Sequence, residues 1–136
     1  MSNQIDVVGA VIWSGGKVLC VQRGAGGSLP GMWEFPGGKI EQDESPAQAL
    51  EREIREELGC RIAVAERLTT TVHAYDFGTI SLTTFHAQLV SGEPTLTEHA
   101  AMQWLAPADL THLDWAPADI PSVELLRAGA TPPARR

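Results

Sequence analysis

Residues 44–58 form the clearest predicted helix in the chain, because both of its ends are marked. Ser45 is a good N-cap, Pro46 falls at the first helical position, and Gln48 falls where a capping box takes Glu or Gln. Gly59 supplies the left-handed residue with which many helices end. A Gly-Gly pair at residues 37–38 precedes the helix, so a turn and a helix with defined ends lie close together in the chain.

The predicted helix has an apolar stripe and an acidic stripe. The apolar stripe must face the core, and its members are Ala47, Leu50, Ile54 and Leu58. Glu53, Glu56 and Glu57 fall on the neighbouring stripe, within an arc of about 100°. Like charges at this spacing cost about 0.2–0.5 kcal/mol per pair, and the cost rises where water is excluded. A cation bound among these carboxylates would offset the repulsion.

Two interpretations of the acidic stripe are open at this point. Most Glu-rich helices present a solvated face, and Glu51 and Arg55, four residues apart, fit that interpretation. The other interpretation is a metal site. Ligands that are all oxygen atoms suit Mg²⁺ or Mn²⁺ and do not suit zinc.

The remaining elements are predicted to be strands and one further helix. The predicted strands cover residues 4–13, 17–23, 61–73, 79–90 and 101–105, and the first two form a hairpin. In the fourth strand the apolar phase switches between Leu82 and Phe85, which a β-bulge or burial of both faces would explain. Residues 120–128 form a second helix, and the glycine-rich residues 24–32 form a loop that either connects two elements or closes over a ligand. This order predicts an α/β fold with a mixed sheet covered by helices.

Length and composition indicate a globular protein. The 136 residues are 43% apolar and 20% charged, and we expect one domain over residues 1–130 followed by a flexible tail at 131–136. The longest apolar run, residues 7–13, is too short to span a bilayer, and no signal pattern is present. We therefore expect a cytoplasmic protein without a membrane partner, either a monomer or a dimer. Cys20 and Cys60 lie in apolar surroundings and are predicted to be buried free thiols.

The net charge limits the possible partners. A charge of −7 argues against a protein that binds a nucleic acid polymer through its phosphates. It does not exclude a small polyphosphate, because a divalent metal can bridge two anionic groups.

The spacing of the charged residues and glycines around the acidic helix matches a known motif. Gly38 is followed after five residues by Glu44, and after seven more by the run REIREELGC, which begins at Arg52. The Nudix box has these residues at these offsets, and only Cys60, at an aliphatic position, departs from it. The chain therefore resembles the Nudix hydrolases, and among them the MutT-like enzymes. The segments WEFPGGKIE, EHAAMQW and APADIP extend the resemblance over nearly the whole chain, and APADIP is similar to the branch that hydrolyses cytidine nucleotides.

The resemblance implies a fold and a reaction. The implied fold is the Nudix α/β/α sandwich around a mixed sheet. The implied reaction, assisted by Mg²⁺ or Mn²⁺, cleaves a nucleoside triphosphate to the monophosphate and pyrophosphate. The implied substrates are modified or damaged nucleotides, such as 8-oxo-dGTP, CTP, dCTP or 5-methyl-dCTP. The implied role is sanitation of the nucleotide pool. One alternative is hydrolysis of ADP-ribose or a dinucleoside polyphosphate. A less favoured alternative is a catalytically silent module that binds a nucleotide.

The resemblance also assigns roles to the acidic residues. Glu53, Glu56 and Glu57 carry over as metal ligands, with the carbonyl of Gly37 nearby and Glu98 as a further ligand. One carboxylate would act as the general base, with Glu53 as the first candidate and Glu98 as the second. Glu98 lies on a predicted loop, where a solvated side chain is the alternative.

Several other residues are expected to support the site. Arg52 would pair with a carboxylate of the helix and fix its rotamer, and Glu44 would support the metal ligands. Arg23 and Lys39 flank the site and would bind phosphate, although each would also suit an ordinary surface position.

Phe35 and Asp119 are the candidates for contact with the base. Phe35 would stack on the base or pack in the core. Asp119 would either cap the second helix or accept hydrogen bonds from an amino-bearing base edge. Cytosine N4 offers such a donor, and 8-oxoguanine offers a ring N–H and an exocyclic amine, so both bases remain open.

The four histidines have no metal-ligand spacing. They are His73, His86, His99 and His112, and we expect structural or surface roles for them. Only His99 stands out, because it adjoins Glu98.

Overall fold

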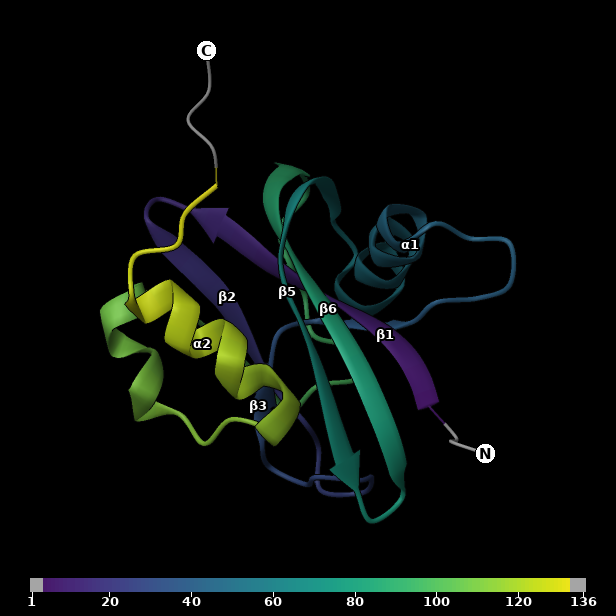
Figure 1. Ribbon diagram of the computed structural model, residues 1–136. Coiled ribbons are helices and arrows are strands. Elements are labelled where there is room, and N and C mark those ends of the chain that lie inside the picture. The colour runs from purple at the N-terminus through teal and green to yellow at the C-terminus, as the bar shows by residue number, and fades with distance from the viewer. Residues whose placement is uncertain (1–3, 133–136) are drawn as a thin grey trace.

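The computed structural model describes residues 4–132, and its elements form a mixed sheet with one α-helix on each face (Figure 1). The strands are β1 (Gln4–Ser14), β2 (Lys17–Gln22), β3 (Trp33–Glu34), β4 (Gly37–Lys39), β5 (Arg61–Tyr75), β6 (Gly78–Ser91) and β7 (Ala101–Leu105). The helices are α1 (Pro46–Leu58) and α2 (Ile120–Arg127), together with the 3₁₀ helices η1 (Pro107–His112) and η2 (Pro117–Asp119). The order and the mixed sheet confirm the predicted α/β fold.

Strand β1 lies at the centre of the sheet. It pairs in parallel with β6 along ten residues of each strand, while its other edge pairs antiparallel first with β4 and then with β2. The strand order is β3-β2-β1-β6-β5, with β7 attached to β2. Because β4 pairs with Val7–Gly9 of β1, the Gly-Gly pair that begins β4 lies within the sheet, close to α1.

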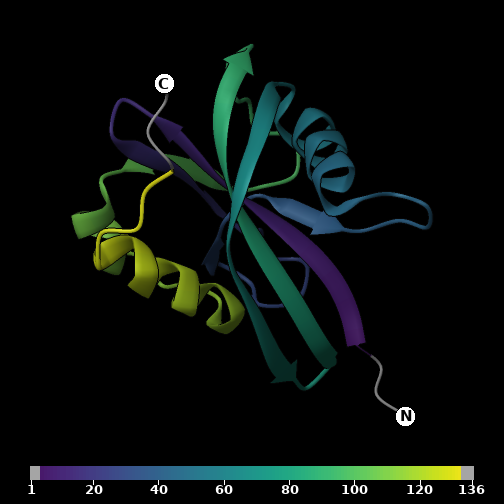
Figure 2. The same ribbon diagram turned by 45° about the horizontal axis from the view of Figure 1, so that its top comes forward.

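Helices α1 and α2 lie on opposite faces of the sheet (Figure 2), and an apolar cluster lies beneath each of them. The cluster beneath α1 contains Leu50, Ile54 and Leu58 with side chains of β1, β2 and β6. The cluster beneath α2 contains Val123 and Leu126 with Phe35 and other side chains. Burial of both faces gives the layered α/β/α arrangement that the sequence predicts.

Helix α1 has the predicted cap. The Ser45 hydroxyl accepts the N–H of Gln48 at 3.1 Å, the Gln48 side chain accepts the N–H of Ser45 at 2.9 Å, and Gly59 is left-handed with φ of 68°. The helix begins at Pro46 and not at residue 44, because Ser45 is extended. Glu44 therefore lies in the loop before the helix.

Of the two predicted causes of the phase switch in β6, the structure shows burial of both faces. Thr84 bonds to Ser122 of α2 at 2.8 Å, whereas Phe85 packs in the α1 cluster, so both faces of β6 are covered. The pairing with β5 also shifts between Val64 and Arg67, and again between Arg67 and Thr69. The extra residues lie on β5, so the bulge belongs to the partner strand.

The remaining expectations have different outcomes. Cys20 and Cys60 are buried free thiols, as predicted. Within residues 4–132, neither α-helix has the length and apolar character needed to cross a bilayer. The predicted tail lies outside the described residues beyond Pro132, and the domain bounds stay a prediction.

Candidate active site

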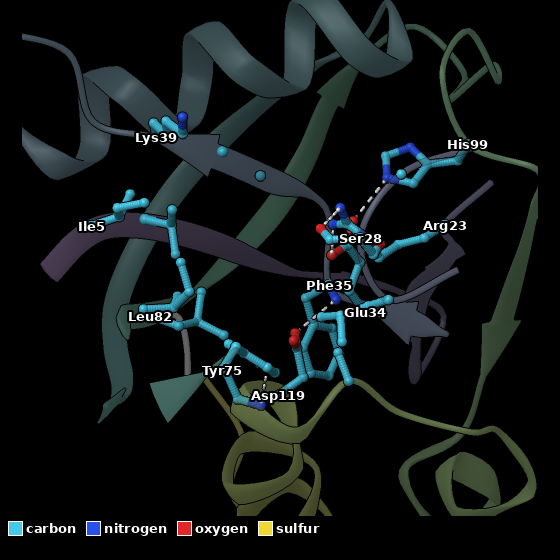
Figure 3. Close-up of a pocket in the computed structure, with 18 of the residues that line it drawn as sticks. Ile5, Arg23, Ser28, Glu34, Phe35, Lys39, Tyr75, Leu82, His99 and Asp119 are labelled. Carbon is cyan, nitrogen blue, oxygen red and sulfur yellow. Dashed lines mark hydrogen bonds and ion pairs between the residues drawn. The ribbon is translucent and has the colours of Figure 1, made fainter. Parts of the chain in front are cut away.

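A cavity of about 700 Å³ opens beside β4 and brings together most of the site residues that the sequence predicts. The predicted residues that line it are Arg23, Phe35, Gly37, Lys39, Glu57, Glu98 and Asp119. In Figure 3, Lys39 and Arg23 lie at opposite sides of the cavity, and Asp119 lies beside Phe35 and Tyr75. The glycine-rich loop contributes Gly24, Gly26, Gly27, Ser28 and Leu29 to the lining, so this loop borders the cavity.

The guanidinium of Arg52 lies among three carboxylates next to the cavity. Its Nε and Nη2 donate to the two oxygens of Glu44 at 2.6 and 3.0 Å. Its Nη1 donates to Glu53 at 3.1 Å and to Glu56 at 3.2 Å. Its Nη2 also donates to the carbonyl of Lys39 at 3.1 Å, so one side chain joins α1 to β4. A planar guanidinium with paired carboxylates restricts the rotamers of all its partners.

The Gly-Gly pair allows α1 to approach the sheet. A Cβ atom on Gly38 would overlap the carboxylate of Glu53, and a Cβ atom on Gly37 would overlap the carbonyl of Val8. Glycine is therefore required at position 37, where the overlap is with the backbone, whereas a side chain at position 38 would displace the Glu53 carboxylate. The Glu53 carboxylate is held between Gly38 and Arg52, close to the carbonyl end of Gly37.

Glu57 has a buried carboxyl group whose negative charge is not compensated by its neighbours. Its Oε1 is buried and has no hydrogen-bond partner among residues 4–132. Burial, with the negative charge of Glu53 as the second cause, raises the pKa of the Glu57 carboxyl to about 9. Glu34 and Glu98 add further negative charge. A bound cation would satisfy the free oxygen and offset this repulsion.

The acidic residues thus fit a divalent metal in chemistry, although they are not already gathered around one point. Within the described part of the chain, no three His, Cys, Asp or Glu side chains are close enough to hold a metal ion. Glu53 and Glu57 are neighbours, and Glu57 and Glu98 both line the cavity. The side chain of Glu56 is 60% exposed, pairs with Arg52 and does not line the cavity.

Asp119 lies at the buried side of the cavity and does not cap α2. Its side chain makes no capping bond, and its Oδ1 instead accepts the N–H of Phe35 at 3.0 Å. Asp119 is 5% exposed, and burial, followed by the charge of Glu34, raises its pKa well above the usual range. Two backbone bonds between Trp33 and the segment 114–116 bring this part of the chain to β3. The helix-cap interpretation of Asp119 is therefore wrong.

Phe35 belongs to the core and to the cavity at once. It is 3% exposed, and its ring centroid lies 4.7 Å from that of Trp115. Because it also lines the cavity, a small part of the ring borders the open space. Packing of Phe35 in the core is therefore compatible with a contact between its ring and a base in the cavity.

Three residues at the cavity were missed from the sequence. Glu34 accepts a hydrogen bond from Arg23 Nη1 at 2.9 Å. Ser28 accepts from Arg23 Nε through its carbonyl at 2.8 Å. Tyr75 accepts the N–H of Ala118 at 2.8 Å. Only Glu34 had a sequence signal, since Trp-Glu-Phe alternates as a strand does and turns Glu34 away from the core.

The histidines have different surroundings. His86 is buried and accepts a hydrogen bond from Trp13 Nε1 at 3.0 Å, and burial lowers its pKa. His73 packs against Tyr75 with ring centroids 4.5 Å apart. His112 is exposed at the end of η1. His99 lines the cavity, and its Nε2 lies 3.1 Å from Glu34 Oε2.

An acidic helix beside a cavity of this size on an α/β/α sandwich is typical of an enzyme site that takes a small ligand. The chain belongs to the Nudix family, because the model described as NUDIX domain matches residues 3–126. This match confirms the resemblance that the box indicated and the fold that it implied.

Individual relatives agree with this assignment. The chain is 41% identical to a CTP pyrophosphohydrolase from Escherichia coli K12 over 93% of each chain. It is 40% identical to a putative 8-oxo-dGTP diphosphatase 2 from Mycobacterium tuberculosis H37Rv, over 88% of this chain and 84% of the relative. A solved structure of the DNA mismatch repair protein MutT, a Nudix hydrolase from methicillin-resistant Staphylococcus aureus 252, is 51% identical. The alignment covers 95% of this chain and all of the other, with a TM-score of 0.76.

Proposed function

We propose that this protein is a divalent-metal-dependent pyrophosphohydrolase that converts a nucleoside triphosphate and water to the nucleoside monophosphate and pyrophosphate. Its proposed substrates are modified or damaged nucleotides with an amino-bearing base, such as 8-oxo-dGTP or CTP, dCTP and 5-methyl-dCTP. The names of the relatives from E. coli and M. tuberculosis support both kinds of substrate. The proposed role is sanitation of the nucleotide pool.

The acidic residues of α1 are the proposed metal ligands. Glu53, Glu56 and Glu57, with Glu98 and the carbonyl of Gly37, would hold Mg²⁺, or Mn²⁺ in its place. The free and buried Oε1 of Glu57 supports this assignment. Bound there, the metal would neutralise the polyphosphate and lower the pKa of a water molecule.

Glu53 is the first candidate for the general base, and Glu98 is the second. Arg52 and Gly38 hold the Glu53 carboxylate from two sides, which fixes the position from which it would take a proton. Glu98 is exposed, lines the cavity, and would act from the segment between β6 and β7. Glu44 supports Glu53 indirectly, because it engages the same guanidinium.

Lys39 and Arg23 are the proposed phosphate contacts. The Lys39 ammonium has no ion-pair partner among residues 4–132, so it is available to an incoming anion. Arg23 is engaged by Glu34 and Ser28, and it would reach a phosphate only by exchanging one of these bonds.

The buried carboxyl of Asp119 is the single observation that carries the proposed base preference. Oδ1 accepts from Phe35, and no donor of residues 4–132 bonds to Oδ2, although the residue lines the cavity. An ionised carboxyl offers two accepting oxygens, and a protonated one still offers its carbonyl oxygen. Because Oδ1 already accepts from Phe35, Oδ2 is the oxygen left for a base. In the ionised state Oδ2 accepts and favours a base that presents an amino group, whereas a proton on Oδ2 would turn it into a donor.

Pyrophosphate release in the presence of Mg²⁺ tests this proposal directly. The triphosphates to compare are 8-oxo-dGTP, dGTP, CTP, dCTP and 5-methyl-dCTP. Hydrolysis of ADP-ribose releases no pyrophosphate, so this compound is followed by the formation of AMP. A preference for 8-oxo-dGTP would make the protein a guanine-nucleotide sanitiser, and a cytosine preference would place it with the cytidine enzymes. Turnover of ADP-ribose alone would refute the proposal, and binding without any turnover would favour a silent module.

A further inference from the structure

The segment between β6 and β7 carries Glu98 to the cavity and is held at both ends. On one side, Thr95 N–H donates to the carbonyl of Leu58 at 2.8 Å, and the Thr97 hydroxyl donates to the carbonyl of Glu57 at 2.7 Å. These two bonds tie the segment to the last turn of α1. On the other side, the N–H of residue 100 donates to the carbonyl of Gln22 at 2.9 Å.

Glu98 itself depends on this backbone for its position. Its side chain makes no hydrogen bond or ion pair with residues 4–132, and the residue is exposed. A free carboxylate samples several rotamers, and its average position follows the backbone that carries it. The neighbours that fix that backbone are Thr97 and His99.

His99 contacts the carboxylate of Glu34, which also accepts a hydrogen bond from Arg23. Its side chain is 8% exposed, and Nε2 lies 3.1 Å from Glu34 Oε2. The other oxygen of Glu34 accepts from Arg23, which in turn donates to Ser28 of the glycine-rich loop at 2.8 and 3.1 Å. We call the linked side chains of Arg23, Glu34 and His99 the Glu34 bridge. Figure 3 shows the bridge crossing one side of the cavity.

The protonation of His99 follows from these contacts. An ionised carboxylate only accepts hydrogen bonds, so Nε2 carries the proton and donates it to Glu34. Nδ1 is buried and has no partner among the described residues. The contact with Glu34 is therefore the one polar bond that holds the ring in place.

We propose that His99 is a positioning residue for Glu98. It fixes the backbone on one side of Glu98, as Thr97 does on the other, and the Glu34 bridge couples this segment to the glycine-rich loop. The inference rests on the proposed function, because it is useful to the enzyme only if Glu98 acts at the metal or as a base. It assigns no contact with substrate to His99.

The first test measures amide hydrogen exchange in the segment 92–100. We expect His99→Leu to speed exchange at Thr95 and at residue 100 by at least tenfold, and His99→Gln, which retains a side-chain donor, to restore slower exchange. The matched control is His112→Leu, which changes an exposed histidine far from the cavity and should leave exchange in this segment unchanged. Equal exchange in wild type and His99→Leu would overturn the inference, whatever the activity of the protein.

The second test asks whether His99 acts through Glu98. We expect His99→Leu to lower kcat for the preferred triphosphate about tenfold while KM changes less than about threefold, because the Asp119 side of the cavity is untouched. The double variant with Glu98→Gln should be no slower than Glu98→Gln alone. Additive losses, or no loss in Glu98→Gln, would overturn the inference.

The positioning role can still be tested if a substitution unfolds the protein. If the melting temperature of His99→Leu shows loss of folding, Thr97→Val provides the equivalent cycle, because it removes only the bond to the Glu57 carbonyl. A wild-type protein that releases no pyrophosphate would refute the proposed function, and the exchange rates would still decide whether His99 holds the segment.

Discussion

The two ends of the cavity are built in different ways. The acidic end comes from one continuous stretch, residues 37–59, in which Arg52 connects the carboxylates of Glu44, Glu53 and Glu56. The base end comes from segments far apart in the chain, since Phe35 and Asp119 are 84 residues apart and meet where the backbone N–H of Phe35 donates to the Asp119 carboxyl.

This difference suggests that the two ends of the cavity have different functions. At the acidic end, ion pairs fix side-chain rotamers, so a substitution there should change turnover. At the base end, the shape depends on how separate segments pack, so a substitution there should change affinity and substrate choice. Single substitutions at each end therefore distinguish a loss of turnover from a loss of affinity.

Glu53→Gln should have the largest effect. Loss of a general base or metal ligand lowers kcat by about 10²–10⁴-fold. Glutamine has the same shape and still accepts the bond from Arg52, so the melting temperature should stay near that of wild type. Unchanged turnover in a folded variant would defeat the assignment of Glu53.

Arg52→Lys should have the next largest effect. Lysine keeps the charge but cannot form the paired bonds to Glu44, so the carboxylates lose their fixed geometry. We expect kcat or the affinity for Mg²⁺ to fall about 10–100-fold, as is typical for residues that orient metal ligands. Arg55→Lys, on the exposed face of the same helix, is the control. Equal rates for the two variants would show that Arg52 has no orienting role.

Asp119→Ala should raise KM about tenfold for the preferred nucleotide, because a base contact contributes about 1–3 kcal/mol of discrimination. It also leaves the buried N–H of Phe35 without an acceptor, which costs about 1–3 kcal/mol of stability. Asp119→Asn retains an acceptor for that N–H and should keep wild-type stability. Steady-state kinetics and thermal unfolding distinguish the two losses, and a change in kcat alone would count against a base contact.

Ser45→Ala should have the smallest effect. It removes the cap of α1, and the free energy of unfolding should fall by about 1 kcal/mol. Because the carboxylates lie in later turns, kcat should stay within about twofold of wild type if the Arg52 contacts hold them independently of the cap. A large fall in kcat would show that the acidic end depends on the helix terminus.

The same comparison explains how much the sequence could predict. Helix α1 was predicted nearly to the residue, because its cap, its apolar stripe and its final glycine are all local signals. The acidic end followed from fixed spacing within that stretch. Strands β3 and β4 were not predicted, because elements of two and three residues are too short for a propensity signal, and two of the three residues of β4 are glycines. They form through pairing with β2 and β1.

The base end could be predicted only in part. Asp119 was proposed, but the helix start after it favoured a cap equally, and only the tertiary position of Phe35 decides between them. Tyr75 lies beyond the predicted strand at residues 61–73, and its bond to Ala118 joins the β5–β6 hairpin to η2 across 43 residues. Contacts of this kind depend on topology, which no local pattern encodes.

The measurement that tests the central claim most directly compares 5-methyl-dCTP with dTTP, in wild type and in Asp119→Ala. Both bases carry the 5-methyl group. They differ at position 4, where 5-methylcytosine has an amino group and thymine a carbonyl oxygen, and at N3, which accepts in 5-methylcytosine and carries a hydrogen in thymine. We predict that wild type has at least a tenfold higher kcat/KM for 5-methyl-dCTP and that Asp119→Ala loses this preference. Equal rates for the two nucleotides in wild type, or a preference that survives in Asp119→Ala, would contradict the account.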